Sequence, residues 1–265
     1  MGSQPVLSQP EALARIRLLR SPNIGPVSYR QLLARFGTAG AELDALPDLA
    51  SRGRGPYRPA SAESIEREVA AVRKAGARYL FHDQSDYPAL LAELDSAPLI
   101  MACRGRLALG HAPCVALVGA RNASAAAVKL ARDFGAALAE AGFTVVSGLA
   151  RGIDGAAHEG AFPATIGVIA SGINIAYPPQ HIELQERIAN EGLLVAEQPP
   201  GTEPARTAFP FEEPHYRRPR VLHAGGRGRA AIGLADHRAA GGRGGARGDG
   251  DPQLSARCAR WVAIS

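Results

Sequence analysis

Two short segments of the chain end an apolar run at a glycine and then present an arginine. Residues 115–121 read Val-Ala-Leu-Val-Gly-Ala-Arg, and residues 144–154 read Thr-Val-Val-Ser-Gly-Leu-Ala-Arg-Gly-Ile-Asp. Apolar runs of this length that stop at glycine are typical of buried parallel strands. The planar guanidinium of arginine donates two parallel hydrogen bonds, which suits a phosphate group. The two segments therefore predict phosphate-binding loops.

The candidate binding residues share one predicted place, the loops that follow three successive strands. They are Gly119, Ala120 and Arg121 after the first strand, Ser147, Gly148, Arg151 and Gly152 after the second, and Ser171 and Gly172 after the third. The carboxyl ends of strands in an α/β sheet line the crevice where ligands bind. The free N–H groups of the helix that starts near Gly152 also favour anions. We expect these loops to form one cleft for phosphate groups.

Other polar residues in this region have structural interpretations. Asp154 stands near a predicted helix start, where an aspartate is more often a cap or a partner of Arg151 than an acid catalyst. His158 and Glu159 lack a second metal-ligand motif, which favours a packed or surface histidine. Nucleophile-elbow, Walker A, paired-carboxylate and dinucleotide-binding motifs are missing from the sequence. We therefore predict no catalytic residue, metal or cofactor.

The positive charge of the chain is confined to its C-terminal end. Residues 217–265 contain ten arginines and three acidic residues, whereas residues 1–216 carry 20 basic and 22 acidic groups. The overall charge of +5 therefore does not indicate DNA binding by the body of the protein. An anion site there must come from local clustering.

The cysteines and the apolar stretches of the sequence indicate where in the cell the protein acts. The three cysteines have unrelated spacings and give no disulfide or metal framework. The sequence contains neither an apolar stretch of membrane-spanning length nor a signal peptide. We expect a cytoplasmic protein with no membrane partner.

The order of predicted elements gives the fold class. Residues 1–50 read as short helices around an Ile-Gly turn, similar to SAM or helix-hairpin-helix modules, and residues 51–60 as a linker. In residues 61–210, strands alternate with helices, which predicts an α/β, Rossmann-like parallel sheet. The helix near 124–141 places Leu130, Phe134 and Leu138 on one face, which we expect to be buried. Whether the helical module touches DNA stays open.

The sequence resembles the DprA/Smf family of DNA-processing proteins. The resemblance runs from about residue 13 to residue 210, and its motifs are residues 115–121, 145–154, 171–181, 197–202 and 209–210. It implies a SAM-like helical domain, an extended Rossmann fold and no catalytic activity. It also implies sequence-independent binding of single-stranded DNA, a homodimer, and loading of a RecA-type recombinase during natural transformation. Ala120 stands where the family has serine, and few aromatic residues lie near the loops to suggest base stacking.

After Pro210 the chain departs from the family pattern. Residues 211–265 are rich in glycine and arginine, a composition that predicts a disordered tail without strands. If residues 231–241 are written in GC-rich codons and read one nucleotide later, the family string Arg-Ser-Gly-Ser-Leu-Ile-Thr-Ala appears. We hypothesise a frameshift; the alternative is a natural RGG-like nucleic-acid tail. The expected consequences are an exposed sheet edge beside the strand near 193–196, a lost dimer interface and impaired activity.

Two other functions remain open from the sequence. One is a Rossmann-like nucleotide or phosphoribosyl hydrolase, which residues 199–203 (Pro-Pro-Gly-Thr-Glu) echo only remotely. The other is a folded remnant without activity.

Overall fold

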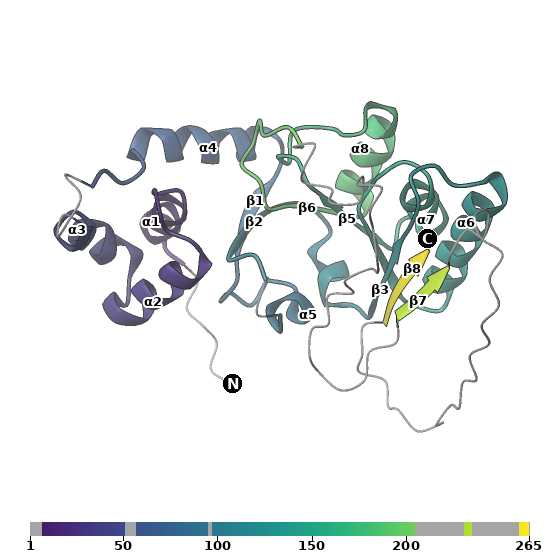
Figure 1. Cartoon of the computed structure of the whole chain (residues 1–265), viewed down its shortest axis with the longest axis horizontal. Coiled ribbons are helices and arrows are strands. Elements are labelled where there is room, and N and C mark those ends of the chain that lie inside the picture. The colour runs from purple at the N-terminus through teal and green to yellow at the C-terminus, as the bar shows by residue number, and fades with distance from the viewer. Residues whose placement is uncertain (1–6, 51–56, 95–96, 205–230, 235–259, 265) are drawn as a thin grey trace, which may run out of the picture.

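A mixed eight-stranded sheet runs through the centre of the computed structural model (Figure 1). The structure describes residues 7–50, 57–94, 97–204, 231–234 and 260–264. The strands are β1 (Arg78–Phe81), β2 (Ile100–Gly105), β3 (Cys114–Val118), β4 (Thr144–Ser147), β5 (Thr165–Ile169), β6 (Leu193–Ala196), β7 (Ala231–Leu234) and β8 (Arg260–Ile264). Their order across the sheet is β1-β2-β6-β5-β4-β3-β8-β7.

The helices fall into an N-terminal group and a group that connects the strands. The first group is α1 (Gln9–Leu19), α2 (Pro26–Phe36), α3 (Ala39–Ala50) and α4 (Ala62–Lys74). The second is α5 (Ala89–Ala92), α6 (Ala125–Glu140), α7 (Ile153–Ala161) and α8 (Ile182–Glu191), with the 3-10 turns η1 (Leu107–His111) and η2 (Pro179–His181). Among the described residues, no helix is both long and apolar enough to cross a membrane.

The strands β3, β4, β5 and β6 are parallel neighbours in chain order. The helices α6, α7 and α8 connect them in turn, which is the βαβ arrangement expected from the sequence. Because all four strands point the same way, their carboxyl ends lie along one edge of the sheet. The predicted Rossmann-like α/β fold is confirmed, and this edge is where the candidate loops emerge.

The edge predicted beside the strand near 193–196 is not exposed. This strand, β6, pairs with β5 on one side and with β2 on the other, where the pairing is antiparallel and places Ala102 opposite Ala196. The expectation was wrong because the sheet continues into residues that precede the Rossmann-like region in the chain. Residues 100–103 of β2 are all buried, as an inner strand requires.

The C-terminal segment supplies two strands, although its composition predicted none. The strand β8 pairs in parallel with β3, with Val115 opposite Arg260 and Val118 opposite Ala263, and β7 pairs with β8. The average composition of the segment concealed two short apolar runs, and the otherwise open edge of β3 offers them a hydrogen-bonding ladder. The predicted disorder of residues 211–230 and 235–259 lies outside the described residues, as do most of the predicted linker and residues 209–210.

The buried face of α6 differs in part from the predicted one: Leu138 packs against the core as expected, but the other two predicted residues do not. Leu130 and Phe134 are 40% and 39% exposed, whereas Ala131 and Gly135 are buried against α7. A Cβ atom at Gly135 would lie 2.5 Å from the carbonyl oxygen of Ala157. The two helix backbones approach too closely for large side chains, so small residues form this contact.

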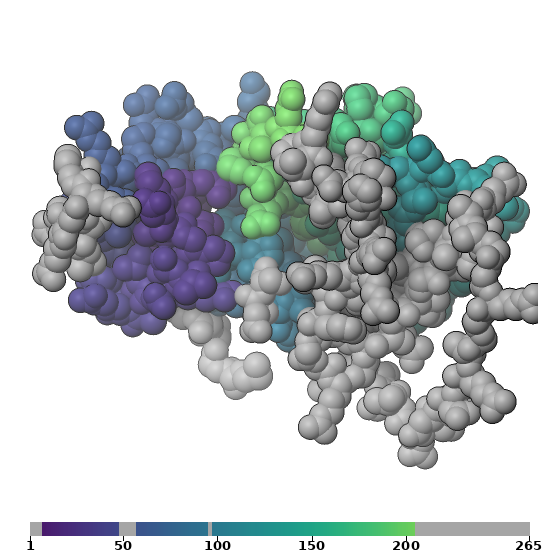
Figure 2. Space-filling model, viewed as in Figure 1, coloured from purple at the N-terminus to yellow at the C-terminus, as the bar shows by residue number. Residues whose placement is uncertain are grey.

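The N-terminal helices pack on the sheet and not only on one another. Their cluster of buried residues includes Ile16 and Leu18 of α1, and it continues through Ile65 of α4 to Phe81 and Ile100 of β1 and β2. Arg15 also pairs with Asp83, just after β1, at 2.7 Å. In the space-filling view, the purple helices form one continuous body with α4 (Figure 2). The helical module is therefore anchored to the sheet.

Candidate phosphate-binding site

A pocket opens at the carboxyl ends of the parallel strands. It has about 420 Å³ of empty space, counting its open mouth. The lining comes from the last residue of β5 and from the segments that follow β3, β4, β5 and β6: Arg121, Gly148, Ala150, Arg151, Ile169, Ala170, Ser171, Tyr177, Pro178 and Pro204. Four predicted site residues therefore meet in one place, namely Arg121, Gly148, Arg151 and Ser171. The other five lie in the same loops or, for Ser147, at the end of β4, and they do not line the pocket.

Asp154, in the first turn of α7, joins two of these loops. Its carboxylate accepts the backbone N–H of Gly119 at 3.2 Å on Oδ1 and that of Gly148 at 3.1 Å on Oδ2. The side chain is 5% exposed. Burial raises the pKa of Asp154, while N–H donation from Gly119, Gly148 and Ala150 opposes that rise. The carboxylate thus fixes the ends of β3 and β4 relative to each other.

Gly152 and Ala120 form the second contact between the same loops. Gly152 has φ +79°, and a Cβ atom there would collide with the carbonyl oxygen of Ala120 and lie 2.7 Å from that of Arg121. The N–H of Ile153 donates to the Ala120 carbonyl at 3.3 Å. A left-handed glycine is needed here because the two backbones touch. These two predicted site residues shape the pocket through backbone packing.

Two serines of the predicted site donate their hydroxyl groups to backbone carbonyls of the protein itself. The Ser147 side chain is 2% exposed, and its Oγ donates to the carbonyl of Leu117 at 2.6 Å. The Ser171 Oγ donates to the carbonyl of Ile175 at 2.9 Å, although Ser171 lines the pocket. Gly172 donates its N–H to the Thr202 carbonyl at 2.8 Å, which holds the segment after β6 against the loop after β5. These residues stabilise the loops themselves.

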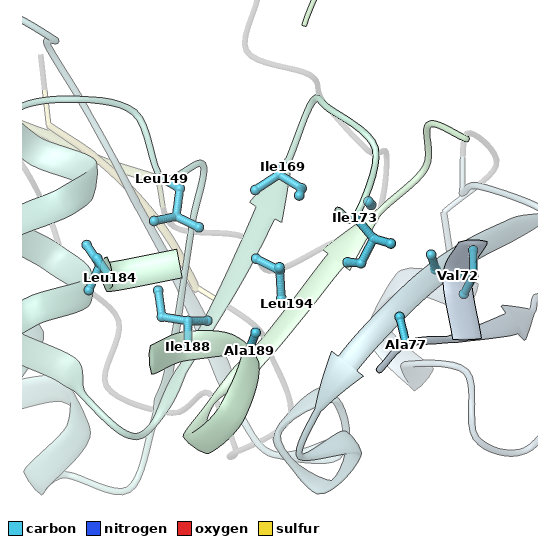
Figure 3. Packing of buried hydrophobic residues seen from close by; sticks show 11 residues of the cluster. Val72, Ala77, Leu149, Ile169, Ile173, Leu184, Ile188, Ala189 and Leu194 are labelled. Carbon is cyan, nitrogen blue, oxygen red and sulfur yellow. The ribbon is translucent and has the colours of Figure 1, made fainter. Parts of the chain in front are cut away.

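Leu149 holds the backbone that presents Arg151. It has φ +57°, a conformation that costs an L-residue about 1–2 kcal/mol. Its side chain is fully buried in a cluster with Ile169, Ile188 and Leu194 (Figure 3). His181 Nδ1 lies 2.9 Å from the Leu149 carbonyl oxygen. Packing and this hydrogen bond offset the strain, a role that the sequence pattern did not reveal for either residue.

His158 is a packed histidine, the interpretation that the sequence favoured. It is fully buried, and its Nδ1 lies 2.7 Å from Thr165 Oγ1, which itself donates to the Val145 carbonyl at 2.9 Å. Burial lowers the pKa of His158 to about 3, so the ring is neutral. Glu159 instead pairs with Arg132 of α6. In the described part of the chain, no three His, Cys, Asp or Glu side chains gather as metal ligands.

Six of the lining residues were not among the predicted site residues; of these, Tyr177, which lies within the motif over residues 171–181, is the one with a polar side chain. It lies in the segment between β5 and η2, and it is 44% exposed. The fold of the intervening loop brings it back to the rim.

Comparison with known proteins identifies the family. Residues 78–214 match the family of DNA recombination-mediator protein A, and residues 9–71 match the DprA-like N-terminal HHH domain. Protein Smf of Synechocystis is 41% identical over 140 residues, which are 50% of this chain and 35% of that protein. The putative DNA processing protein DprA of Mycobacterium tuberculosis is 34% identical over 223 residues, 78% of this chain and 53% of that protein.

A solved structure is also similar to this chain. The X-ray structure of DNA processing protein A from Streptococcus pneumoniae aligns with a TM-score of 0.51 at 32% sequence identity, over 57% of this chain and 52% of that one. The chain spans about half the length, or less, of the relatives that it matches. Since the family match covers more than half of the chain, the chain belongs to the DNA recombination-mediator protein A family, DprA/Smf.

Proposed function

We propose that this chain binds single-stranded DNA through its sugar-phosphate backbone, with Arg121 and Arg151 as the phosphate clamps. The observation that carries the proposal is that these two arginines come from different strand ends and line one pocket. Family membership supports DNA as the ligand.

The proposed recognition does not depend on base sequence. Contacts to phosphates position a strand but carry no sequence information. The arginine-bearing loops are held by Asp154 and by the backbone contact at Gly152. A site that is already ordered loses little conformational entropy when a strand binds. This is the property expected of a protein that must accept any incoming strand.

The wider role is part of the same proposal. We propose that the bound strand passes to a RecA-type recombinase during DNA uptake in natural transformation, which would place the protein in the cytoplasm. A homodimer is the expected assembly of the family, and the family match ends at residue 214, near the start of the aberrant tail. We therefore propose that the C-terminal end of the chain is a frameshifted translation. This change would weaken the dimer and impair loading of the recombinase. The role is one of binding and not of catalysis.

The experiment is a fluorescence-anisotropy titration of the full-length chain with labelled oligo-dT. The variant Arg121→Ala/Arg151→Ala should weaken binding by at least about tenfold per arginine, because charge-assisted hydrogen bonds contribute about 1.5–3 kcal/mol each. The slope of log K against log salt should become shallower by about 1.4. The matched control Arg73→Ala/Lys74→Ala removes the same charge from the end of α4.

Two outcomes would contradict the proposal. One is equal loss of affinity in the two double variants, which would indicate non-specific attraction. The other is undiminished binding by the Arg121→Ala/Arg151→Ala variant, combined with loss of binding when Arg227, Arg229, Arg243 and Arg247 are changed to glutamine. That result would assign DNA binding to the tail.

A further inference from the structure

We infer that residues 205–230 cross the sheet face opposite α6, α7 and α8, and that Phe209 and Phe211 cover the apolar side chains exposed there. The inference goes beyond the proposed function, because it concerns how the chain returns from β6 to β7 and not how it binds DNA. It starts from the two faces of the parallel part of the sheet, which are covered unequally in the described structure.

One face of the parallel sheet carries the three helices that connect β3 to β6. Val115 of β3 lies in one buried cluster with Ala131 of α6 and Ile153 of α7. Farther along, Leu194 of β6 packs with Ile188 of α8. The register of the four strands places Val115 and Leu194 on the same face. This arrangement is expected, because right-handed crossovers that run in one direction across a sheet lie on one face.

The opposite face is exposed at the carboxyl ends of the central strands. Val118 of β3 and Val168 of β5 lie on this face, because each follows a residue that faces the helices. They are 40% and 46% exposed. Val146 of β4 lies on the same face and is partly buried. We call the surface formed by these three valines the open face. Parallel sheets are normally covered on both faces, so a further segment is expected over it.

The path of the chain identifies residues 205–230 as that segment. The strands from β6 to β7 are all parallel, so the chain must return across the sheet from the end of β6 to the start of β7. This return runs opposite to the crossovers from β3 to β6. A right-handed connection in the opposite direction lies on the opposite face, and about 98% of parallel connections are right-handed. The chain between Pro204 and Ala231 should therefore pass over the open face.

The length and the sequence of residues 205–230 fit this path. The distance across the sheet from β6 to β7 is roughly 24 Å, at about 4.8 Å for each pair of neighbouring strands, whereas an extended chain of this length reaches roughly 85 Å. Pro204 lines the pocket at the carboxyl ends of the strands, where the open face begins. Phe209 and Phe211 are the first aromatic residues after it. Phe209 is within roughly 17 Å of Pro204 along the chain, so both rings can reach the open face.

The test is disulfide formation within the full-length chain after its three cysteines, Cys103, Cys114 and Cys258, have been changed to alanine. Under mild oxidation, Val168→Cys/Phe209→Cys should lose both free thiols while the protein stays a monomer, as measured by mass spectrometry. The matched control is Leu130→Cys/Phe209→Cys. Leu130 is similarly exposed, at 40%, but it belongs to α6 on the other face of the sheet. The control pair should keep both thiols.

A double-mutant cycle tests the same contact with the natural cysteines in place. Val168→Ala and Phe209→Ala should be coupled by at least about twofold in the equilibrium constant for unfolding, because side chains in contact do not contribute additively. Leu130→Ala and Phe209→Ala should be additive. Urea denaturation of the full-length chain measures both cycles.

Three outcomes would overturn the inference. One is an internal disulfide in the control pair. Another is no disulfide in either pair together with additive cycles, which would show that Phe209 does not lie over the open face. The third is a disulfide between two molecules of Val168→Cys/Phe209→Cys with a dimer of the unmodified chain in analytical ultracentrifugation, which would assign the open face to a second copy. These outcomes leave the proposed function untouched, because Arg121→Ala/Arg151→Ala tests DNA binding separately.

Discussion

Asp154 on α7 accepts the backbone N–H of Gly119 at the end of β3, at 3.2 Å. Its second carboxylate oxygen accepts the N–H of Gly148 at the end of β4, at 3.1 Å. A buried carboxylate close to an anion site would repel the ligand if charge alone decided its effect. Its position shows a different function: it sets the distance between the two loops that carry Arg121 and Arg151.

Asp154→Asn should therefore change DNA affinity in opposite directions through loop geometry and through charge. The amide retains one acceptor and turns a donor toward a backbone N–H, which costs about 1–3 kcal/mol for a buried unsatisfied group. We expect a lower free energy of unfolding and weaker oligo-dT binding, although a negative charge has been removed. Urea denaturation and anisotropy measure the two effects. Asp133→Asn, a surface change on α6, is the control, and tighter DNA binding by Asp154→Asn would show that charge repulsion dominates.

Gly152→Ala tests the backbone contact between the loops. Gly152 combines φ +79° with a collision of any Cβ against Ala120 and Arg121. Gly142 has φ +83° and nothing within 4 Å of its Cβ position, so Gly142→Ala measures the conformational cost alone. That cost is about 1 kcal/mol. We expect Gly152→Ala to lose clearly more stability and to weaken DNA binding, whereas Gly142→Ala should bind normally. Equal losses in stability would mean that the loops do not depend on close approach.

Glu42 predicts a pH dependence of stability that arises in the N-terminal helices. The residue is fully buried on α3, and in the described structure neither carboxylate oxygen has a hydrogen-bond partner. Burial raises the pKa of Glu42 to about 7; the charge of Glu11 adds to the rise and that of Arg15 opposes it. Arg15 is itself bound to Glu11 and Asp83. Tyr29 of α2 also faces these charges.

The direction of this pH dependence follows from the raised pKa of Glu42 in the folded state. The stabilising contribution of protonated Glu42 is complete below the unfolded-state pKa near 4.5 and is lost as the pH rises toward 7. Urea denaturation should show the unmodified chain losing on the order of 3 kcal/mol between pH 5 and pH 8 relative to Glu42→Gln, which cannot ionise. Glu140→Gln, an exposed change on α6, should follow the unmodified chain. Parallel pH profiles for the unmodified chain and Glu42→Gln would refute the assignment.

Local sequence patterns predicted the parallel strands, their helices and the loops that carry Arg121, Arg151 and Ser171. Those features depend on short-range signals: apolar runs, glycine stops and helix periodicity. The sequence could not predict the roles of Leu149 and His181, because each acts through contacts that form only after folding. The buried face of α6 was predicted wrongly for the same reason, since the approach of α7 and not the spacing of leucines decides it.

The last prediction concerns the C-terminal segment, which composition alone described as strandless. Trp261 is the single tryptophan of the chain and lies in β8, opposite Ala116 of β3. Because β8 pairs with β3, the backbone that carries this indole unfolds with the sheet. We expect tryptophan fluorescence and far-UV circular dichroism to give the same urea midpoint, as a cooperative transition requires. A fluorescence transition whose urea midpoint differs from that of circular dichroism would contradict the pairing of β8 with β3. The strand that carries the Arg121 loop would then be the edge of the sheet.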